Sequence, residues 1–217
     1  MSDIFDEVDE ELRADRAKKL LQRYAGLIVG AAVLLVAGVG AWKALQWYQA
    51  RETARVADAY LAATHEAEAA GAPEHDAAMA GFAQVAGQGS AGYRTLARLR
   101  AAAIKADSGD LPAALALWND VAADTSADKL LRDLASLEWA QHQIDKGDPA
   151  QVAARLAPLA APENPWHALA QEAQAMLALR QAKTAEARDI LKRLSQDVTA
   201  PEGVRRRATG LLAEIGG

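Results

Sequence analysis

The chain has 217 residues, no cysteine and a formal net charge of −5 at pH 7. The lack of cysteine excludes disulfides and thiolate metal sites, and it is compatible with an oxidising compartment such as a bacterial periplasm. Because no part of the chain forms a basic domain, the composition also argues against a nucleic-acid-binding protein.

Residues 1–23 form a charged segment that precedes the first apolar run. The segment holds seven acidic and five basic residues. Within it, Ile4, Val8 and Leu12 follow a helical spacing. This spacing predicts either a short cytoplasmic interaction helix or a tail that folds only on a partner.

An unbroken run of eighteen apolar or glycine residues, from Ala25 to Trp42, follows this segment. A helix over the run rises about 27 Å, and a helix over 24–48 covers the hydrocarbon thickness of a bilayer with room for tilt. Aromatic rings, which prefer the headgroup layer, lie at its two ends: Tyr24 at one, and Trp42, Trp47 and Tyr48 at the other. Residues 24–48 are therefore predicted to form a transmembrane helix.

Basic residues set the expected orientation of this helix. Five lysines and arginines precede the run, whereas three follow it closely, namely Lys43, Arg51 and Arg55. Because the end richer in Lys and Arg stays in the cytoplasm, we predict a single-pass protein with residues 1–23 in the cytoplasm and residues 49–217 on the far side. The alternatives are a cleaved signal peptide, whose apolar core is usually shorter, and a helix buried in a globular core.

Gly26 and Gly30 form a G-x-x-x-G motif within the predicted span. Small residues at this spacing let two membrane helices approach closely. Glycine is also common in spans that do not associate. Both an associated and a single span therefore fit the motif.

Residues 49–217 contain an internal repeat, and a repeat period determines the architecture. The stretches 93–110 and 131–148 align at an offset of 38 residues. Each has the apolar spacing of an amphipathic helix and ends in Gly-Asp, a helix stop followed by a helix start. Helices are therefore predicted at 93–105 and 131–144.

A second kind of helix repeats between these stretches. Its apolar residues recur at i, i+4 and i+7, so each copy presents one stripe to a neighbouring helix. The four stripes are Ala78, Phe82 and Val85; Ala114, Trp118 and Val121; Val152, Leu156 and Leu159; and Ala187, Leu191 and Leu194. Helix starts are predicted at polar caps that precede an early proline, namely Asp110, Asp148, Asn164 and Thr199.

Helix pairs with a period near 34 residues and small residues at their crossings resemble tetratricopeptide repeats. We therefore predict an all-α protein, in which a single N-terminal transmembrane helix is followed by a tetratricopeptide-like α-solenoid of helix-turn-helix pairs. About three and a half repeats are expected, with a helix at 201–215 that caps the stack. Pro158 is expected to end or kink its helix. Three tryptophans are expected to anchor the core rather than a ligand: Trp118, Trp139 and Trp166.

The sequence contains no pattern that indicates catalysis. Its four histidines are not spaced as a helical ligand pair, and phosphate-binding, dinucleotide-binding and nucleophile-elbow motifs do not occur. We therefore expect no enzymatic activity, metal or cofactor. An enzymatic alternative would depend on Glu74 and His75. The basic cluster Arg205, Arg206 and Arg207 is interpreted as a solvated helix face.

The layout and several blocks of sequence resemble one family of envelope proteins. The blocks are SDIFDEVDEELRADRAKKLLQRYAGLIVGAAVLL near the N-terminus, SGDLPAALALWNDVAAD at 108–124 and ENPWHALAQEAQAMLALRQAKTAEARDIL at 163–191. They are similar to the YfgM-like ancillary subunits of the SecYEG translocon, and the first block is similar to the alphaproteobacterial branch. The resemblance implies a non-catalytic bacterial inner-membrane protein with a periplasmic repeat domain. It also implies association with the protein translocon, with a periplasmic chaperone or prolyl isomerase, and with exported polypeptides.

Stacked helix pairs of this kind form a curved surface that the first helix of each pair lines. From helix position alone, a protein-binding groove is predicted at Arg94, Arg98, Asp133, Glu138 and Gln141. The alternative function is a cell-envelope scaffold that coordinates division or wall synthesis, because the same kind of repeat domain occurs in such coordinators.

Overall fold

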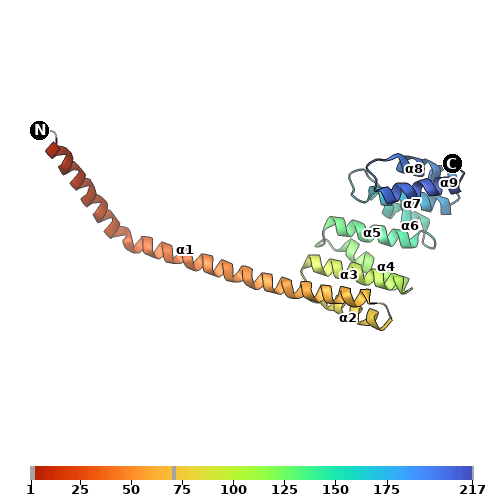
Figure 1. The fold of residues 1–217 in the computed structure, drawn as a ribbon, viewed down its shortest axis with the longest axis horizontal. Helices are drawn as coiled ribbons and strands as arrows, with labels where there is room; N and C mark the ends of the chain where they lie inside the picture. Colours follow the sequence, from red (N-terminus) through yellow and green to blue (C-terminus); the bar gives the residue numbers. More distant parts are fainter. Residues whose placement is uncertain (1–2, 70–71, 217) are drawn as a thin grey trace. The chain divides into compact units, whose positions relative to one another are not determined.

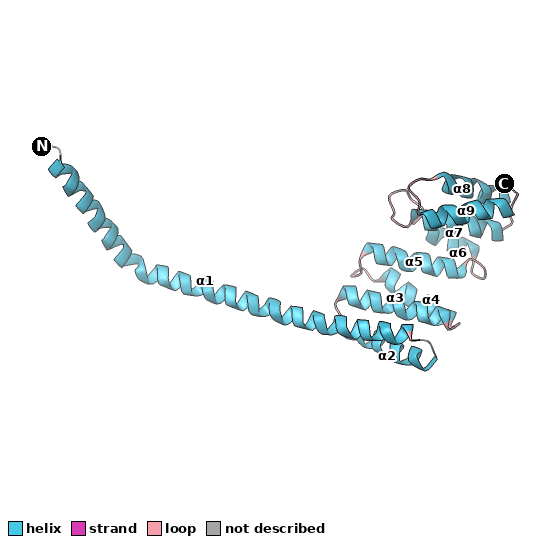
Figure 2. Cartoon of the chain, in the orientation of Figure 1, coloured by secondary structure: helices cyan, strands magenta, loops and turns pink. Residues whose placement is uncertain are grey.

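The computed structural model describes the backbone of residues 3–69 and 72–216. Side chains are not described at 3–17, 19–22, 28 and 72–75. The predicted stripe of Ile4, Val8 and Leu12 and the pair Glu74 and His75 therefore lie outside the described side chains. The described backbone consists of helices joined by turns and contains no strand (Figure 2), which confirms the all-α prediction.

The helices follow one another in series along the chain (Figure 1). Their bounds are α1 Asp3–Glu68, α2 Ala72–Gln88, α3 Ala91–Asp107, α4 Leu111–Ala123, α5 Lys129–Gln143, α6 Pro149–Leu156, α7 His167–Arg180, α8 Thr184–Gln196 and α9 Glu202–Glu214. The chain divides into two compact units, Met1–Ala54 and Arg55–Gly217. This division falls after Tyr48, where the apolar composition ends, so helix α1 contributes to both units.

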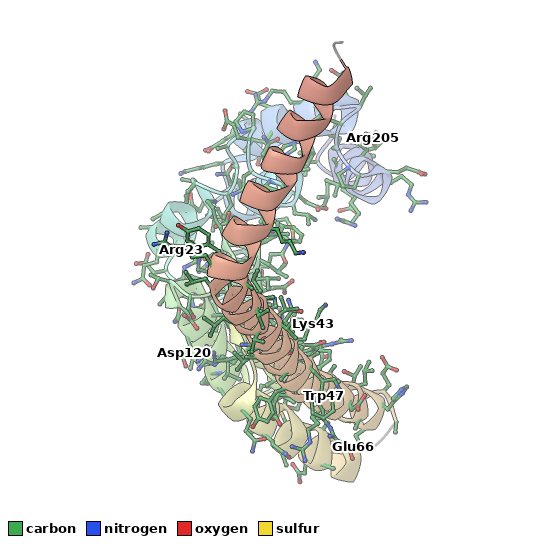
Figure 3. All side chains as sticks on the ribbon, turned by 90° about the vertical axis from the view of Figure 1, so that its left-hand side faces the viewer. Arg23, Lys43, Trp47, Glu66, Asp120 and Arg205 are labelled. Atoms are coloured by element: carbon green, nitrogen blue, oxygen red, sulfur yellow. The ribbon has the colours of Figure 1, made fainter. Side chains whose placement is uncertain are left out.

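In the first unit, α1 carries the apolar run with its side chains unburied. From Arg23 onward this helix is long and apolar enough to cross a membrane, and none of its apolar window is buried within the protein. Leu34, for example, is 74% exposed. Arg23 and Lys43 bracket the run, and Trp47 follows Lys43 along the same helix (Figure 3).

The last turns of α1 belong to the second unit. The ring of Tyr60 lies 5.7 Å from that of Phe82 on α2 and 6.0 Å from that of Tyr93 on α3, measured between centroids. Ala63 is buried at a close crossing with Gly81 of α2. The end of α1 is therefore the first helix of the first pair, a role that the sequence pattern did not reveal.

The second unit is a stack of helix pairs. Within residues 55–69 and 72–216, the pairs are the end of α1 with α2, α3 with α4, α5 with α6, and α7 with α8, and α9 follows as a single helix. Three and a half repeats were expected. The end of α1 supplies the other helix of the half repeat, so the number of pairs is four. All twelve residues of the four predicted stripes are buried, each 3% exposed or less, which confirms the repeat assignment.

Helix α9 closes the stack and has two different faces. Val204 and Ala208 are buried in one cluster with residues of α7 and α8. Arg206, Thr209 and Ala213 are exposed on the outer side. An outer face of polar and small side chains is what a terminal repeat needs in order to shield its neighbour from water. The predicted capping helix is therefore present at nearly its predicted bounds.

The turns between paired helices use the predicted Gly-Asp signals. Gly109 has a φ of +85°, a left-handed conformation that glycine adopts without strain. The side chain of Asp110 accepts a hydrogen bond from the amide of Ala113, and Asp148 caps α6 in a similar way. At the equivalent turn before α8 stands Ala182, whose φ of 59° is costly for a residue with a Cβ.

Two of the four predicted caps are wrong. Helix α7 begins after Trp166 and α9 after Pro201, rather than at Asn164 and Thr199. The side chain of Asn164 accepts a hydrogen bond from the amide of Trp166, and the hydroxyl of Thr199 donates to Asp197 over 2.6 Å. Such local hydrogen bonds compete with helix capping because they use the same short polar side chains.

Pro158 and the tryptophans act as predicted. Helix α6 ends at Leu156, before Pro158. Trp118 is 2% exposed and belongs to the core. Trp139 and Trp166 are partly buried and pack against the core cluster that joins α5, α6 and α7. All three indole rings therefore contribute to packing.

Replacement of Ala182 by glycine is expected to stabilise the pair of α7 and α8. Glycine removes the left-handed strain, so the free energy of unfolding should rise by about 0.5–1 kcal/mol after glycine's own entropy cost is subtracted. The measurement is the thermal midpoint of the full-length chain in detergent, followed by circular dichroism. The reciprocal control is Gly109→Ala, which should lower that midpoint. An unchanged midpoint for Ala182→Gly would contradict the assignment of strain.

Two glycines of α2 offer a matched test of the crossing between α1 and α2. A Cβ on Gly81 would lie 2.8 Å from the Cβ of Ala63, whereas a Cβ on Gly87 would have no atom within 4 Å. Gly81→Ala should therefore cost about 1–3 kcal/mol through overpacking, while Gly87→Ala should leave stability unchanged or raise it through helix propensity. Equal unfolding midpoints for the two variants would show that α1 does not pack on α2.

Candidate protein-interaction surface

Two hollows lie on the face of the second unit that its first helices line. The smaller, the α3–α5 hollow, has a volume of about 260 Å³ and is walled by Tyr60, Leu96, Arg100, Leu134 and Glu138, among others. The larger, the α5–α9 hollow, has a volume of about 650 Å³ and includes Gln141, Ile144, Glu172, Met176, Arg207 and Glu214. Volumes of several hundred Å³ are typical of binding sites.

The structure places two of the five predicted groove residues in these hollows. Glu138 lines the α3–α5 hollow and Gln141 lines the α5–α9 hollow. Both lie on α5, one helical turn apart. Their role in binding stays a prediction, but they are on the face where a partner has access.

Arg94 and Arg98 face the turn between α4 and α5. Nη1 of Arg98 lies 3.3 Å from Oδ2 of Asp124. Hydrogen bonds from the hydroxyl and the amide of Ser126 lower the pKa of Asp124, and the charges of Arg94 and Arg98 lower it further. Arg98 therefore ties α3 to the end of α4 within one pair, and the charge of Arg94 acts on the same carboxylate.

The same tie recurs in the last pair. Nε2 of His167 at the start of α7 lies 3.9 Å from Oδ2 of Asp197 at the end of α8. The spacing of 30 residues equals that between Arg94 and Asp124. The hydroxyl and amide of Thr199 lower the pKa of Asp197, as Ser126 does for Asp124. In both pairs, a basic side chain at the first helix contacts an aspartate at the end of the second helix. These side chains therefore stabilise the turn and do not form a ligand site.

Asp133 also takes part in the packing of turns. Its Oδ2 accepts hydrogen bonds from Nζ of Lys129 over 2.6 Å and from Nδ2 of Asn164 over 2.8 Å. Asn164 is 7% exposed, so the bond links α5 to the buried turn before α7. Of the predicted set, Arg98 and Asp133 therefore have structural partners of their own.

Glu138 lies in an environment that disfavours its charge. Burial raises the pKa of this carboxyl group, and the nearby ring of His142 opposes the shift. His142 in turn stacks on Trp118, with a distance of 4.5 Å between ring centroids. Glu138 is thus a half-buried acid next to an aromatic wall.

The wall of the α5–α9 hollow contains an ion pair that was not predicted from the sequence. Nε and Nη2 of Arg207 donate to the two carboxylate oxygens of Glu172 over 2.5 and 2.6 Å. Glu172 is 6% exposed, and the hydrogen bond to it raises the pKa of Arg207. The sequence contains an indication of this ion pair, because Glu172 occupies the repeat position that holds Leu99 and Leu137 in the preceding pairs. A charged residue at a position that is otherwise apolar requires a partner.

Two of the three arginines in the cluster that was interpreted as a solvated face make contacts within the protein, although the side chain of Arg207 stays 55% exposed. Arg207 binds Glu172, and Nη1 of Arg205 donates to the carbonyl of Ala200 over 3.0 Å. Arg206 is exposed as expected. Long arginine side chains reach across a turn or to the next helix, which a helical wheel does not represent.

The predicted span residues lie exposed on the first unit. Tyr24, Trp42, Trp47 and Tyr48 are all at least 46% exposed. A Cβ built on Gly26 or Gly30 would have no atom within 4 Å. The surface around the two glycines is therefore open along the helix, and close association there stays a prediction.

Among the side chains that the structure describes, no group of three potential metal ligands occurs. Nδ1 of His142 contacts the carbonyl of Glu138, and Nδ1 of His167 contacts the carbonyl of Asn164. Both rings thus have local structural contacts.

A family model described as a tetratricopeptide repeat-like domain matches residues 18–207. The match includes the apolar run of α1 and all the helix pairs. No curated protein matches the chain, and no solved structure matches it either.

Truncation of Arg207 is expected to destabilise the end of the stack. In Arg207→Ala the buried carboxylate of Glu172 loses its partner, at a cost of about 2 kcal/mol. The double variant Glu172→Leu, Arg207→Met restores the leucine of the other pairs and should unfold within about 1 kcal/mol of the natural chain, or above it. Urea unfolding of the full chain in detergent measures both. A double variant less stable than Arg207→Ala would contradict the equivalence of Glu172 with Leu99 and Leu137.

Proposed function

Because the chain belongs to the tetratricopeptide repeat-like domain family, we propose that it is a membrane-anchored, non-catalytic scaffold whose repeat unit binds other proteins. Domains of this architecture present extended surfaces made of stacked helices. The two hollows on the face of α3, α5, α7 and α9 are the binding surface in this proposal.

One observation carries the proposal: a single helix, α1, contains both the apolar run and the first helix of the repeat stack. The sequence between Lys43 and Glu68 has neither glycine nor proline, and α1 is continuous over it. Anchor and binding domain are therefore consecutive parts of one element. A tethered binder meets its partners at a high effective concentration, so weak contacts are sufficient.

The proposed arrangement has three parts. Residues 1–23 lie in the cytoplasm, residues 24–48 cross the bacterial inner membrane, and residues 49–217 form the periplasmic domain. The excess of Lys and Arg before the span supports this orientation. The lack of cysteine is compatible with a periplasmic location.

The proposed partners follow from the resemblance to YfgM-like ancillary translocon subunits. They are the protein translocon, a periplasmic chaperone or prolyl isomerase, and exported polypeptides. In this function the hollows hold segments of exported chains briefly as they leave the channel. The hollows suit brief contact because they are open and partly apolar rather than closed around a single ligand.

Site-specific photo-crosslinking in living cells tests this function. A photoreactive amino acid at Gln141 or Met176, both in the wall of the α5–α9 hollow, is expected to capture translocon subunits or exported polypeptides. The matched control is the same amino acid at Asp120, which is exposed on α4 outside both hollows. Mass spectrometry identifies the captured proteins.

The outcomes of this crosslinking experiment, and of a separate labelling experiment, distinguish the proposed function from its alternatives. Capture of division or wall-synthesis enzymes from Gln141 and Met176 would replace the translocon with the alternative of an envelope coordinator. Equal capture from Asp120 would remove the hollows from the proposal. Labelling of the repeat unit by a reagent that reaches only the cytoplasm would reverse the orientation.

A further inference from the structure

The α5–α9 hollow has an apolar wall that is open to a partner. Met176 on α7 is 43% exposed, and Leu211 on α9 lines the same space together with Ile144, the buried C-cap of α5. The hollow extends to Gly210, where an added Cβ would have no atom within 4 Å. The hollow is open at this point because Gly210 has no side chain to fill it.

The composition of this wall suits a variable partner. Methionine is flexible and polarisable, so it adapts its shape to different apolar side chains. The volume of about 650 Å³ lies in the range of sites that enclose a ligand of several side-chain groups. An extended polypeptide segment, which presents one side chain after another, fits such an open hollow.

The charges of the hollow favour a cationic partner. Glu172 is neutralised by Arg207, which uses Nε and Nη2 for that bond. Glu214, in the same wall, has no ion-pair partner among the described residues. The hollow thus offers a carboxylate without a counter-charge, whereas its arginine is already paired.

We infer that the α5–α9 hollow binds an extended polypeptide segment in which an apolar side chain stands next to a lysine or arginine. The apolar side chain contacts Met176 and Leu211, and the cation lies against the carboxylate of Glu214. This inference rests on the proposed function, because it names the class of polypeptide that the same face binds.

Two substitutions test the apolar part and the charged part of this site separately. Gly210→Trp fills the hollow, and the open space at this position means that the ring need not enter the core. Glu214→Lys reverses the unpaired charge on an exposed helix end. The matched controls are Thr209→Trp, at the exposed neighbouring position of α9, and Asp120→Lys, which makes the same change of net charge on α4.

The experiment uses the full-length chain in phosphatidylcholine nanodiscs and three fluorescent peptides of equal length. The first peptide combines leucine with lysine, the second leucine with glutamate, and the third serine with lysine. Fluorescence anisotropy gives each affinity, with the signal of empty nanodiscs subtracted. The leucine–lysine peptide should bind most tightly of the three. We expect Gly210→Trp to weaken it about tenfold and Glu214→Lys to weaken it about fivefold while strengthening the leucine–glutamate peptide.

The controls separate this inference from the proposed function. Thr209→Trp and Asp120→Lys should bind all three peptides as the natural chain does. Equal binding of all peptides, or binding that Gly210→Trp and Glu214→Lys leave unchanged, overturns the inference while a polypeptide-binding scaffold stands. Binding of none of the peptides overturns both. Circular dichroism of each variant establishes that its helices are intact.

Discussion

The close approach of helices at small residues is the constraint on which the repeat unit depends. Ala102, Ala140 and Ala175 occupy equivalent positions of α3, α5 and α7, and all three have 0% of their surface exposed. At the first pair, Gly81 lies against Ala63 so closely that a methyl group does not fit. Because small residues set the spacing, the larger apolar side chains must fill the layers between the crossings at close to crystal density. The pairs therefore stack in a single register.

That register determines what the binding face contains. Each pair repeats the same positions, so Glu172 stands at the position that a leucine occupies in the two preceding pairs. A carboxylate in such a buried place requires a partner, which Arg207 of α9 provides. The larger hollow opens beside this ion pair, where α9 carries Gly210. The larger hollow thus lies at the end of the stack, where the sequence departs from its own repeat.

The departures also explain what could be predicted from the sequence. The buried stripes were predictable because a helix that is covered on one side keeps an apolar period over three or four turns. The first helix of the first pair was missed because it continues from the apolar run without a Gly-Asp stop. The groove was predicted only in part because periodicity separates a buried side from an exposed one, but not two exposed sides from each other. Arg98 and Asp133 lie on the side that meets the turns.

The shared helix α1 bears on whether the anchor is retained. A signal peptidase cut near Ala41 would leave Trp42, Trp47 and Tyr48 at the start of a soluble helix, and these rings are 64%, 63% and 61% exposed. Their apolar rings would then face water, at a cost of about 25 cal/mol for each Å² of apolar area. In a bilayer the same rings occupy the headgroup layer, where indole and phenol groups are favoured. The physical chemistry of these few residues therefore favours a chain that keeps its membrane helix.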